Sequence, residues 1–574
     1  ELINLLTEEN AKRLQCQNES KISVVIGNPP YNANQKNYNN QNANRPYPKI
    51  DKRIRETFTK ESRAQKKKYE DMYLRFYRWA MDRVDDKNGG IVAFVSNRSF
   101  VDAINTDGFR AVIGKEFDYL YILDTQSDVR KNPKISGTKN NVFGIQTGVA
   151  LMFAVKSPHD PQENPVIQYY TMRDEDTREE KLQFLRHSAL NTIPWTRIYP
   201  DQHNNWLNIS NTDYTDLLPI VVKDGIGIFY QCFPGISTNR TEWLFDFSPK
   251  LLSKKVKYFV KTYNKSVAEN KMDASIKWSE TLNKNLESSA SAKYSKSHIL
   301  FSTFRPYIKK YYYSDPFLSD RFTDNHLNCA ALDNKYIAYS GRGHNHVFSA
   351  LASKYLPELH SIENGQCLPL YIKNKAGKQT GNITDWALTT FSEHYSNKTI
   401  TKDDIFHYVY AVFHNPGYKE KYKDELRREH PAIPFYKDFK KWAAWGKALM
   451  DIHVNYETAE EYPVKISISK SETIKNEFKF DKKSNRIIID DAVITGIPPE
   501  ALNYKLCIRS ALEWIIDQYK IRPIDDKTIM EYFNDYHYSD YKNEIITLIK
   551  KIITVSLKTL GIIQQMEAQP ANNE

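Results

Sequence analysis

Four consecutive residues near the amino end, Asn28-Pro29-Pro30-Tyr31, combine hydrogen-bond acceptors with a flat aromatic ring. The side chain of Asn28 offers an amide oxygen, and the carbonyl of Pro29 is a second acceptor on a residue without an N–H. Two acceptors held together suit an amino group that has two protons to donate. Tyr31 adds a face on which a planar ring can stack. The tetrapeptide therefore predicts a site that binds a planar amine and orients its nitrogen.

The segment before these residues must hold them in place. Residues 22–27 are rich in valine and isoleucine, a pattern typical of a strand covered on both faces of a sheet. Pro29 and Pro30 end this strand because neither can donate a ladder hydrogen bond. Open α/β sheets bind ligands beyond the carboxyl ends of their parallel strands. Although an Asn-Pro pair also begins ordinary turns, its position here favours the chemical interpretation.

The chain that follows alternates between helical and strand patterns. Apolar residues recur with the period of a helix over residues 69–84, and Asn-Gly-Gly ends that helix. Further expected elements are a helix over 3–14, strands at 91–95 and 119–123, a helix around 108–117, and a strand over 147–155. This order predicts a doubly wound parallel α/β sheet closed by an antiparallel pair.

Bulk properties limit the class of protein. A chain of 574 residues is too long for one core, so we expect roughly two to four domains. The net charge of +11 is compatible with a polyanionic partner. Five well-separated cysteines give neither a disulfide framework nor a zinc knuckle, and we expect no metal site at His326, His344 or His346. Without a bilayer-spanning stretch or a signal peptide, we expect the bacterial cytoplasm.

A polar insertion follows the proposed site. Residues 32–44 contain seven asparagines, and eleven Lys or Arg against three acids give residues 36–68 a local charge of +8. The insertion is either a solvated loop, because Asn-rich segments bury little surface, or a loop that contacts a phosphate backbone. Its position favours the second interpretation. The candidate DNA contacts here are Arg45, Lys49, Lys52, Arg53, Arg55, Lys66, Lys67 and Lys68.

Beyond residue 157 the alternation is lost, and residues 157–165 have the composition of a linker. The later segments mix basic residues, asparagine and aromatics in turns, a mixture that contacts phosphates and base edges. The candidates are Asn239, Arg240, Arg305, Lys309 and Lys310, each with a structural role as the alternative. Helices that serve as scaffold are predicted at 405–413, 438–450, 501–519 and 541–560.

Several of these segments together resemble the methyltransferase portion of single-polypeptide Type ISP restriction–modification enzymes, motifs IV to VIII in order. The segments that carry this resemblance are residues 24–31, 73–83, 90–100, 128–133 and 141–148. Later segments resemble the target-recognition region of the same family, namely 235–243, 304–313, 365–371, 383–387, 405–411 and 509–514.

The resemblance implies a fold and three domains. Residues 1–157 would be the carboxyl-terminal half of a Rossmann-like amino-methyltransferase domain, with an incomplete sheet. Residues 158–450 would form a mixed α+β DNA target-recognition domain, and 451–574 its C-terminal strand and helical part.

The resemblance also implies an activity, N6-adenine methylation of double-stranded DNA with S-adenosylmethionine. Asn28, Pro29, Pro30 and Tyr31 would be the catalytic residues, and the target base would stack between Tyr31 and Phe143. The Gly-rich cofactor loop of the family precedes the Asn-Pro-Pro-Tyr strand, and only 27 residues precede Asn28 here. Residues for the cofactor are therefore expected upstream, in the methyltransferase, helicase and nuclease portion of a longer polypeptide.

Two alternatives remain open at this stage. The chain could be a DNA-recognition fragment that is catalytically incomplete without its cofactor half. It could also be an amino-methyltransferase acting on protein glutamine or on RNA, since such enzymes contain the same tetrapeptide. The sequence gives neither the recognition site nor the methylated strand.

Overall fold

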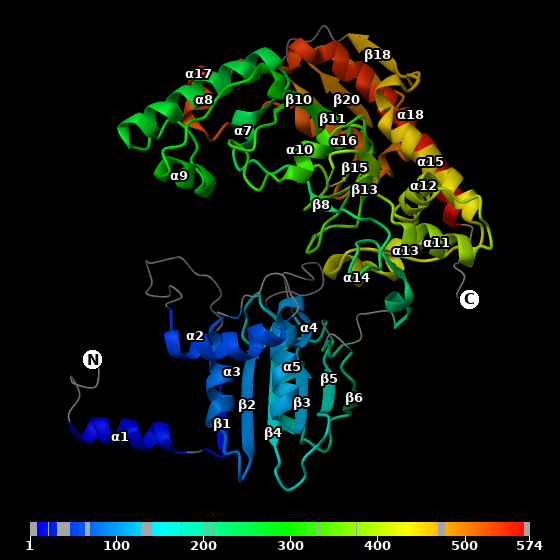
Figure 1. Cartoon of the computed structure of the whole chain (residues 1–574). Coiled ribbons are helices and arrows are strands. Elements are labelled where there is room, and N and C mark those ends of the chain that lie inside the picture. Colours follow the sequence, from blue (N-terminus) through cyan, green and yellow to red (C-terminus); the bar gives the residue numbers. More distant parts are fainter. Residues whose placement is uncertain are drawn as a thin grey trace. The chain divides into compact units, whose positions relative to one another are not determined.

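The computed structural model describes residues 8–20, 22–30, 46–62, 69, 71–127, 140–173, 175–201, 204–207, 212–330, 332–374, 376–468 and 477–567. They form two compact units, Glu1–Ile209 and Ser210–Glu574, drawn in Figure 1. Each unit has its own hydrophobic core.

A six-stranded sheet with the order β1-β2-β4-β3-β5-β6 organises the first unit. The strands are β1 (Val24–Gly27), β2 (Gly90–Asn97), β3 (Tyr119–Asp124), β4 (Val149–Lys156), β5 (Val166–Thr171) and β6 (Thr196–Ile198). β1 runs parallel to β2, and β3 runs parallel to β5, whereas β4 pairs antiparallel with both β2 and β3. The expected α/β class is confirmed, but the antiparallel strand lies inside the sheet.

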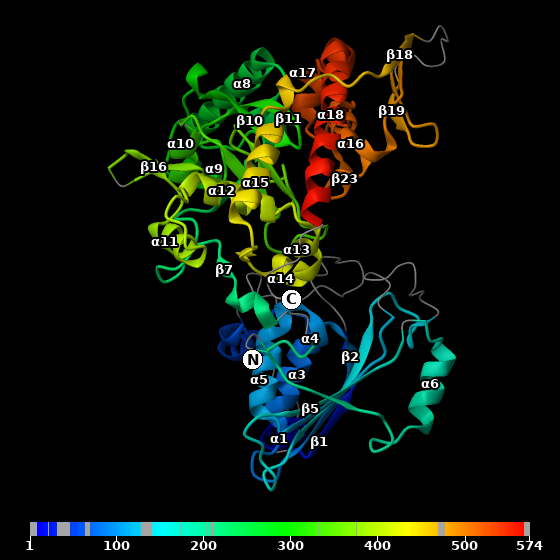
Figure 2. The same cartoon turned by 90° about the vertical axis from the view of Figure 1, so that its right-hand side faces the viewer.

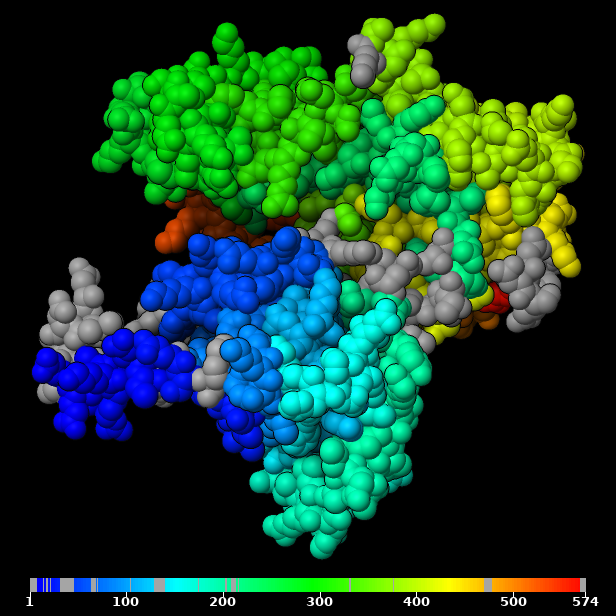
Figure 3. Space-filling view, turned by 60° about the horizontal axis from the view of Figure 1, so that its bottom comes forward, coloured from blue at the N-terminus to red at the C-terminus, as the bar shows by residue number. Residues whose placement is uncertain are grey.

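The helices of this unit are α1 (Glu8–Glu19), α2 (Pro48–Ile54), α3 (Met72–Arg83), α4 (Ser99–Asp102), α5 (Asp107–Glu116) and α6 (Arg178–His187). Helices α3 and α5 lie on one side of the sheet and α6 on the other (Figure 2). Tyr77 of α3 contacts Phe94 of β2 with ring centroids 4.9 Å apart, and Phe184 of α6 stacks on Tyr170 of β5. Helix α1 lies at the outside of the unit, and its described side chains are exposed or half-buried (Figure 3).

The first unit extends beyond residue 157, where the sequence pattern placed a domain boundary. Strand β5 pairs in parallel with β3, and β6 pairs with β5, so both belong to the six-stranded sheet. The connection from β4 to β5 is held by Asp118, whose carboxylate accepts hydrogen bonds from the N–H groups of Ser157 and Gln162. A polar, proline-containing connection within one sheet and a linker between domains have the same composition, so the sequence could not separate them.

Strand β1 is covered on one face only, in contrast to the predicted burial on both faces. Val25 packs into the core, whereas Val24 is 56% and Ile26 80% exposed. Because side chains alternate across a strand, the two exposed residues share one face. Among the described strands β1 is also at the edge of the sheet, so this apolar surface adjoins a strand edge.

The second unit is a mixed α+β assembly of several small sheets. A three-stranded sheet has the order β10-β11-β9, and two four-stranded sheets have the orders β13-β12-β14-β8 and β18-β21-β20-β19. Two-stranded pairs are β15-β16, β17-β7 and β22-β23. The strands are β7 (Leu218–Pro219), β8 (Phe233–Pro234), β9 (Phe245–Asp246), β10 (Ile299–Arg305), β11 (Ile308–Tyr313), β12 (Tyr336–Tyr339), β13 (Ala350–Ser353), β14 (Gln366–Pro369), β15 (Tyr371–Lys373), β16 (Gln379–Gly381), β17 (Ala432–Ile433), β18 (Lys465–Ile468), β19 (Phe478–Asp481), β20 (Arg486–Ile489), β21 (Ala492–Thr495), β22 (Lys505–Leu506) and β23 (Arg509–Ser510).

Helices connect and cover these sheets. They are α7 (Thr241–Leu244), α8 (Pro249–Glu269), α9 (Glu280–Glu287), α10 (Asp324–Ala330), α11 (Asp385–His394), α12 (Lys402–Val412), α13 (Pro416–Lys421), α14 (Lys423–Arg428), α15 (Phe439–Val454), α16 (Ala511–Tyr519), α17 (Lys527–Tyr532) and α18 (Lys542–Glu567). Helices α12 and α15 approach closely at Gly446, where a Cβ atom would lie 1.7 Å from the carbonyl oxygen of His407. In the described ranges no helix is long and apolar enough to cross a membrane.

Three of the four predicted scaffold helices are present as α12, α15 and α18. The fourth begins ten residues later than predicted, because residues 505–510 form the β22–β23 hairpin. Cys507 in its turn has a left-handed backbone, with φ of 57°, which a helix cannot contain. Ser510 then caps α16 by accepting a hydrogen bond from the N–H of Glu513. Apolar spacing predicted the helix, but not this turn before it.

A buried polar network joins several of these elements. The ring of His453 contacts the hydroxyl of Tyr410 at 2.6 Å and that of Thr559 at 2.9 Å. Tyr504 lies 3.3 Å from the same ring and 3.0 Å from the hydroxyl of Tyr307. Burial lowers the pKa of His453 to about 3. The imidazole is therefore held neutral inside the second unit.

This network predicts an acid-sensitive fold. Above pH 6.5 His453 is neutral in both the folded and the unfolded chain, and its contribution to stability is complete. Below pH 6.5 the unfolded chain gains a proton that the folded chain does not, so stability falls until the folded pKa near 3 is reached. The loss approaches about 1.4 kcal/mol per pH unit for this residue.

Urea unfolding between pH 7 and pH 4.5 measures this loss. The variant His453→Gln should show a smaller decrease in unfolding free energy over that range than the unmodified chain. His537→Gln removes an exposed histidine of the same unit and should leave the decrease unchanged. Identical pH profiles for the unmodified chain and His453→Gln would contradict the prediction.

Candidate functional site

The predicted amine-binding residues lie at the carboxyl end of β1. Gly27 ends the strand opposite Phe94 of β2, and Asn28 and Pro29 follow it without regular secondary structure. Asn28 is exposed and Pro29 is buried, so the proline packs against the unit while the asparagine is accessible from outside. Tyr31, the predicted stacking residue, lies outside the described residues.

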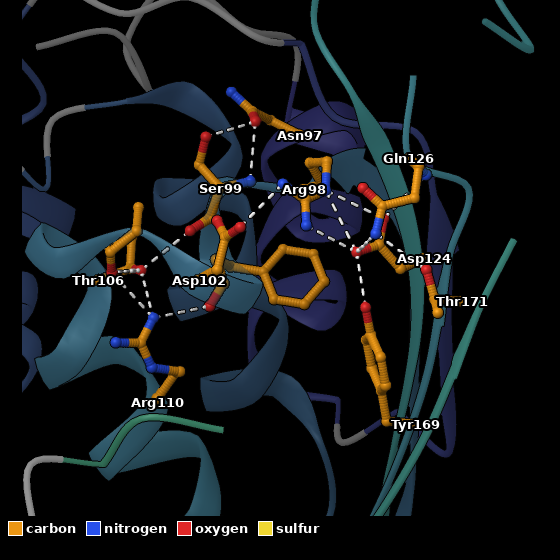
Figure 4. A network of polar contacts seen from close by, with 12 residues as sticks. Asn97, Arg98, Ser99, Asp102, Thr106, Arg110, Asp124, Gln126, Tyr169 and Thr171 are labelled. Carbon is orange, nitrogen blue, oxygen red and sulfur yellow. Dashed lines mark hydrogen bonds and ion pairs between the residues drawn. The ribbon is translucent and has the colours of Figure 1, made fainter. Parts of the chain in front are cut away.

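An ion pair joins the ends of the neighbouring strands (Figure 4). Arg98 directly follows β2, and its Nε and Nη2 donate to the two carboxylate oxygens of Asp124, which ends β3, at 3.0 and 2.8 Å. Its Nη1 donates to Asp102 of α4 at 2.9 Å. The Arg98 side chain is 4% exposed and that of Asp124 is fully buried. The pair therefore acts inside the unit, away from water.

Further donors complete the environment of Asp124 (Figure 4). The hydroxyl of Tyr169 donates at 3.0 Å and the N–H of Gln126 at 2.9 Å. Burial acts to lower the pKa of Arg98, but hydrogen bonds and charge from Asp124 and Asp102 outweigh it and raise that pKa above its usual value. Burial, with the charge of Asp124, raises the pKa of Tyr169. Both groups stay protonated, which indicates a positioning role and not acid–base chemistry.

The same arginine fixes the loop that carries Phe143. Its stem packs on Gly148, where a Cβ atom would lie 2.3 Å from the Cδ of Arg98, and its N–H donates to the Gly148 carbonyl. The Asn141 side chain donates to the Thr147 carbonyl at 2.8 Å and accepts from the N–H of Phe143 at 2.9 Å. Within this hydrogen-bonded segment, Phe143 is 47% exposed. Because the loop joins the end of β3 to the start of β4, it lies at the same edge of the sheet as Asn28.

The basic insertion is described in part. Ile54 and Phe58 pack into the core, and the carboxylate of Asp51 pairs with Arg75 of α3 at 2.7 Å. This anchoring turns the basic candidates Lys49, Lys52, Arg53 and Arg55 outward, and all four are exposed. Arg53 also pairs with Asp82 at 3.2 Å. Arg45, Lys66, Lys67 and Lys68 lie outside the described residues.

Two basic candidates of the second unit, one buried and one partly buried, are paired within the fold. Arg240 is buried, donates to the carbonyl of Leu318 and the hydroxyl of Ser279, and lies 3.7 Å from the Asp320 carboxylate. Burial lowers its pKa to about 10, against the charge of Asp320. Arg305 pairs with Glu358 at 2.6 Å. These guanidinium groups are engaged within the fold, and the structure favours their structural role.

The remaining candidates are exposed or partly buried. Asn239 is exposed, and its side chain donates to Asp320 at 2.6 Å. Lys309 pairs with Glu457 at 2.5 Å. The Nζ of Lys310 lies over the rings of Phe247 and Phe304 at 4.4 and 4.2 Å. Burial lowers the pKa of Lys310 to about 7, so its side-chain amine is only partly protonated at neutral pH.

Two groups of charged residues in the structure were not singled out by the sequence analysis. The Arg98–Asp124 pair had a signal, namely an arginine directly after one predicted strand and an aspartate at the end of the next. The second group consists of lysines at helical spacing, Lys250, Lys254, Lys257, Lys261 and Lys265, all exposed on α8. Their spacing was visible in the sequence, but it did not show that all five side chains are exposed.

Comparison with known proteins gives the family. A family model described as the Type ISP C-terminal specificity domain matches residues 227–548, more than half of the chain. The chain belongs to the Type ISP family. A second model, described as Eco57I restriction-modification methylase, matches residues 2–129 and therefore includes β1, α3 and β2. The resemblance found in the sequence is thus confirmed. A search of curated proteins gave no match.

Three solved structures are similar over 98% of this Type ISP chain. A cryo-EM structure of a DrdV–DNA complex is 36% identical, with a TM-score of 0.80. A nuclease-deletion mutant of the Type ISP enzyme LlaGI, in complex with a DNA substrate mimic, is 30% identical, with a TM-score of 0.76. The ATP-dependent Type ISP enzyme LlaBIII bound to DNA is 26% identical, with a TM-score of 0.78. The match covers 59%, 54% and 38% of those chains, respectively.

The buried ion pair yields a stability prediction. Arg98→Met leaves Asp124 charged, buried and without its main partner, so the free energy of unfolding should fall by about 3–5 kcal/mol. Arg98→Met combined with Asp124→Leu removes both charges and should recover part of that loss. Urea unfolding followed by circular dichroism compares the two variants. A double variant no more stable than the single one would contradict the prediction.

Proposed function

We propose that this chain is the substrate side of a site-specific DNA adenine-N6 methyltransferase, joined to its DNA target-recognition domain. The observation that carries the proposal is the pair of acceptors, the Asn28 amide oxygen and the Pro29 carbonyl, at the carboxyl end of β1. They lie within the residues matched by a restriction-modification methylase model. The second unit contains the matched specificity domain, which supports target recognition.

The target base is an adenine turned out of the duplex. Enzymes that act on a base extrude it from the stack because its reactive atoms are otherwise inaccessible. An exposed asparagine beside a buried proline supports this role, since a flipped base can reach the first while the second packs against the unit. Phe143, half-exposed at the same edge, offers a ring for stacking, and Tyr31 is proposed for the other face.

The acceptors would act by position and polarisation. Accepting both N6 protons draws the nitrogen lone pair out of conjugation with the ring and fixes its direction. A fixed direction lowers the entropic part of the barrier, and no strong base is required. The polar environment of Asp124 would serve this geometry by keeping β2, β3 and the Phe143 loop in place.

S-adenosylmethionine is proposed as the methyl donor, with a site completed by residues outside the described ones. A nucleotide-like cofactor needs a Gly-rich turn after a parallel strand. Within the described part of the first unit, no Gly-x-Gly sequence follows a strand. These residues therefore do not fit the cofactor by themselves. We propose that the exposed apolar face of β1, with Val24 and Ile26, packs against the remaining half of a Rossmann-like sheet.

Double-stranded DNA is the proposed partner. The three similar structures are complexes with DNA or with a DNA substrate mimic, which favours DNA over RNA or protein glutamine. Those chains are considerably longer; one of them is a nuclease-deletion mutant and another is an ATP-dependent enzyme. We propose a comparable upstream portion as the second partner, with the assembly working in the bacterial cytoplasm.

The role of Asn28 can be tested in the complete enzyme. Asn28→Ala should lower the methylation rate by at least about a hundredfold, because one of two groups that orient the amine is lost. Affinity for DNA should change little, since this residue does not hold the duplex. Asn88→Ala, an exposed asparagine in the turn before β2, is the matched control and should methylate normally. Retained methylation by Asn28→Ala would overturn the assignment.

The proposed incompleteness of the cofactor site predicts a binding result. Calorimetric titration of the 574-residue chain with S-adenosylmethionine should give no measurable heat of specific binding, whereas the complete enzyme should bind. Binding by the chain alone would show that its own residues form the cofactor site. The same titration distinguishes the two interpretations of the chain. If the chain is half of a methyltransferase, adding the upstream portion should restore binding of S-adenosylmethionine; if it is a recognition fragment, it should not.

A further inference from the structure

One face of a helix in the second unit carries several positive charges and is not part of the site described above. Helix α8 contains six lysines and one acid, Glu269. Lys255 is buried and pairs with Asp246 at 2.8 Å. The other five, Lys250, Lys254, Lys257, Lys261 and Lys265, are exposed. We call these five residues the lysine face.

The helical spacing places the lysine face on a single stripe. Successive residues of an α-helix turn by about 100° and rise about 1.5 Å, so the five lysines lie within an arc of about 80° over about 22 Å. Leu252, Val256, Phe259 and Tyr263 are buried on the opposite side. Helix α8 is at the surface of the second unit in both cartoon views (Figures 1 and 2).

Few acids neutralise this stripe. Lys265 lies 3.8 Å from Glu269, and within the described ranges Lys250, Lys254 and Lys261 have no ion-pair partner. Like charges three and four residues apart on a helix repel and destabilise it. The surrounding segment adds to the charge, since residues 249–298 contain eleven lysines and four acids, a net of +7.

Aromatic residues border the lysine face on both sides. On one side the Nζ of Lys257 lies 5.0 Å from the ring centroid of Tyr294, whose hydroxyl is 2.7 Å from that of Ser253. On the other side Tyr258 stacks on Tyr532 of α17, which is 60% exposed. Rows of lysines with aromatic edges fit a polyanion that runs along the helix.

We infer that the lysine face of α8 is a docking surface for the phosphate backbone of double-stranded DNA. Charge complementarity carries the inference, because a row of like charges over about 22 Å matches the regular charge of a duplex strand. Contacts to phosphates hold and orient the protein without reading sequence. The inference rests on the proposed function, since it assumes that the chain binds duplex DNA, and it adds a surface distinct from the adenine site.

The salt dependence of binding tests this surface. The probe is a 30-base-pair duplex of random sequence, titrated with the 574-residue chain at several salt concentrations. Each lost phosphate contact lowers the magnitude of the slope of log K against log salt by about 0.9. Raising the salt from 50 to 200 mM lowers the affinity of each protein by some factor. For the triple variant Lys250→Gln/Lys254→Gln/Lys261→Gln, that factor should be about forty times smaller than for the unmodified chain. A second duplex of unrelated sequence should give the same change.

A matched triple variant controls for net charge. Lys423, Lys479 and Lys482 are exposed lysines of the second unit that pair with acids, at 3.6, 2.9 and 2.5 Å. Their replacement by glutamine removes the same charge and should leave the salt slope close to that of the unmodified chain. Circular dichroism should show both triple variants folded, because neither replaces a buried side chain.

The outcomes separate this inference from the proposed function. An unchanged slope for the α8 variant, or an equal change in the control, overturns the lysine face while duplex binding stands. No binding of either duplex by the unmodified chain overturns both proposals. A reduced slope confined to the α8 variant supports the inference.

Discussion

A buried ion pair between Arg98 and Asp124 holds together the edge of the sheet where the proposed chemistry takes place. It joins the end of β2 to the end of β3, and the stem of the arginine packs on Gly148 before β4. Charges inside a protein are stable only when all their hydrogen bonds are made, and here Tyr169, Gln126 and Asp102 complete the set. The loops that follow these strands therefore start from fixed positions. Both Asn28 and Phe143 depend on this edge.

The second unit shows two uses of positive charge. Arg240 is buried and Arg305 is partly buried, and each pairs with an acid and lies over an aromatic ring. The lysines of α8 lie in water with few partners. Arginine suits the first use because its planar fork makes several directed hydrogen bonds, whereas lysine is a compact, hydrated charge on a flexible stem. A basic residue in a recognition segment is thus not by itself a contact to DNA.

Much of the first unit could be predicted from spacing alone. The periods of the apolar residues gave α3, α5, β2, β3 and β4 close to their observed bounds, because local pattern and final structure agree there. The boundary at 157 and the partial exposure of β1 could not be predicted in this way. Which strand pairs with which, and what covers a strand's second face, depends on segments distant in sequence. The pairing of β5 with β3 is such a case.

The sequence by itself determined the chemistry that the site offers, since acceptors without competing donors are a property of Asn-Pro-Pro-Tyr in any fold. It also determined the family, through motifs whose order survives without a structure. Only the tertiary structure decided which basic side chains are exposed and therefore available to contact DNA. Burial removed Arg240 from the surface and an ion pair with Glu358 engaged Arg305, whereas the five lysines of α8 stayed exposed. The pairing of the arginines and the exposure of the lysines both depend on three-dimensional neighbours, which residue types and spacing do not contain.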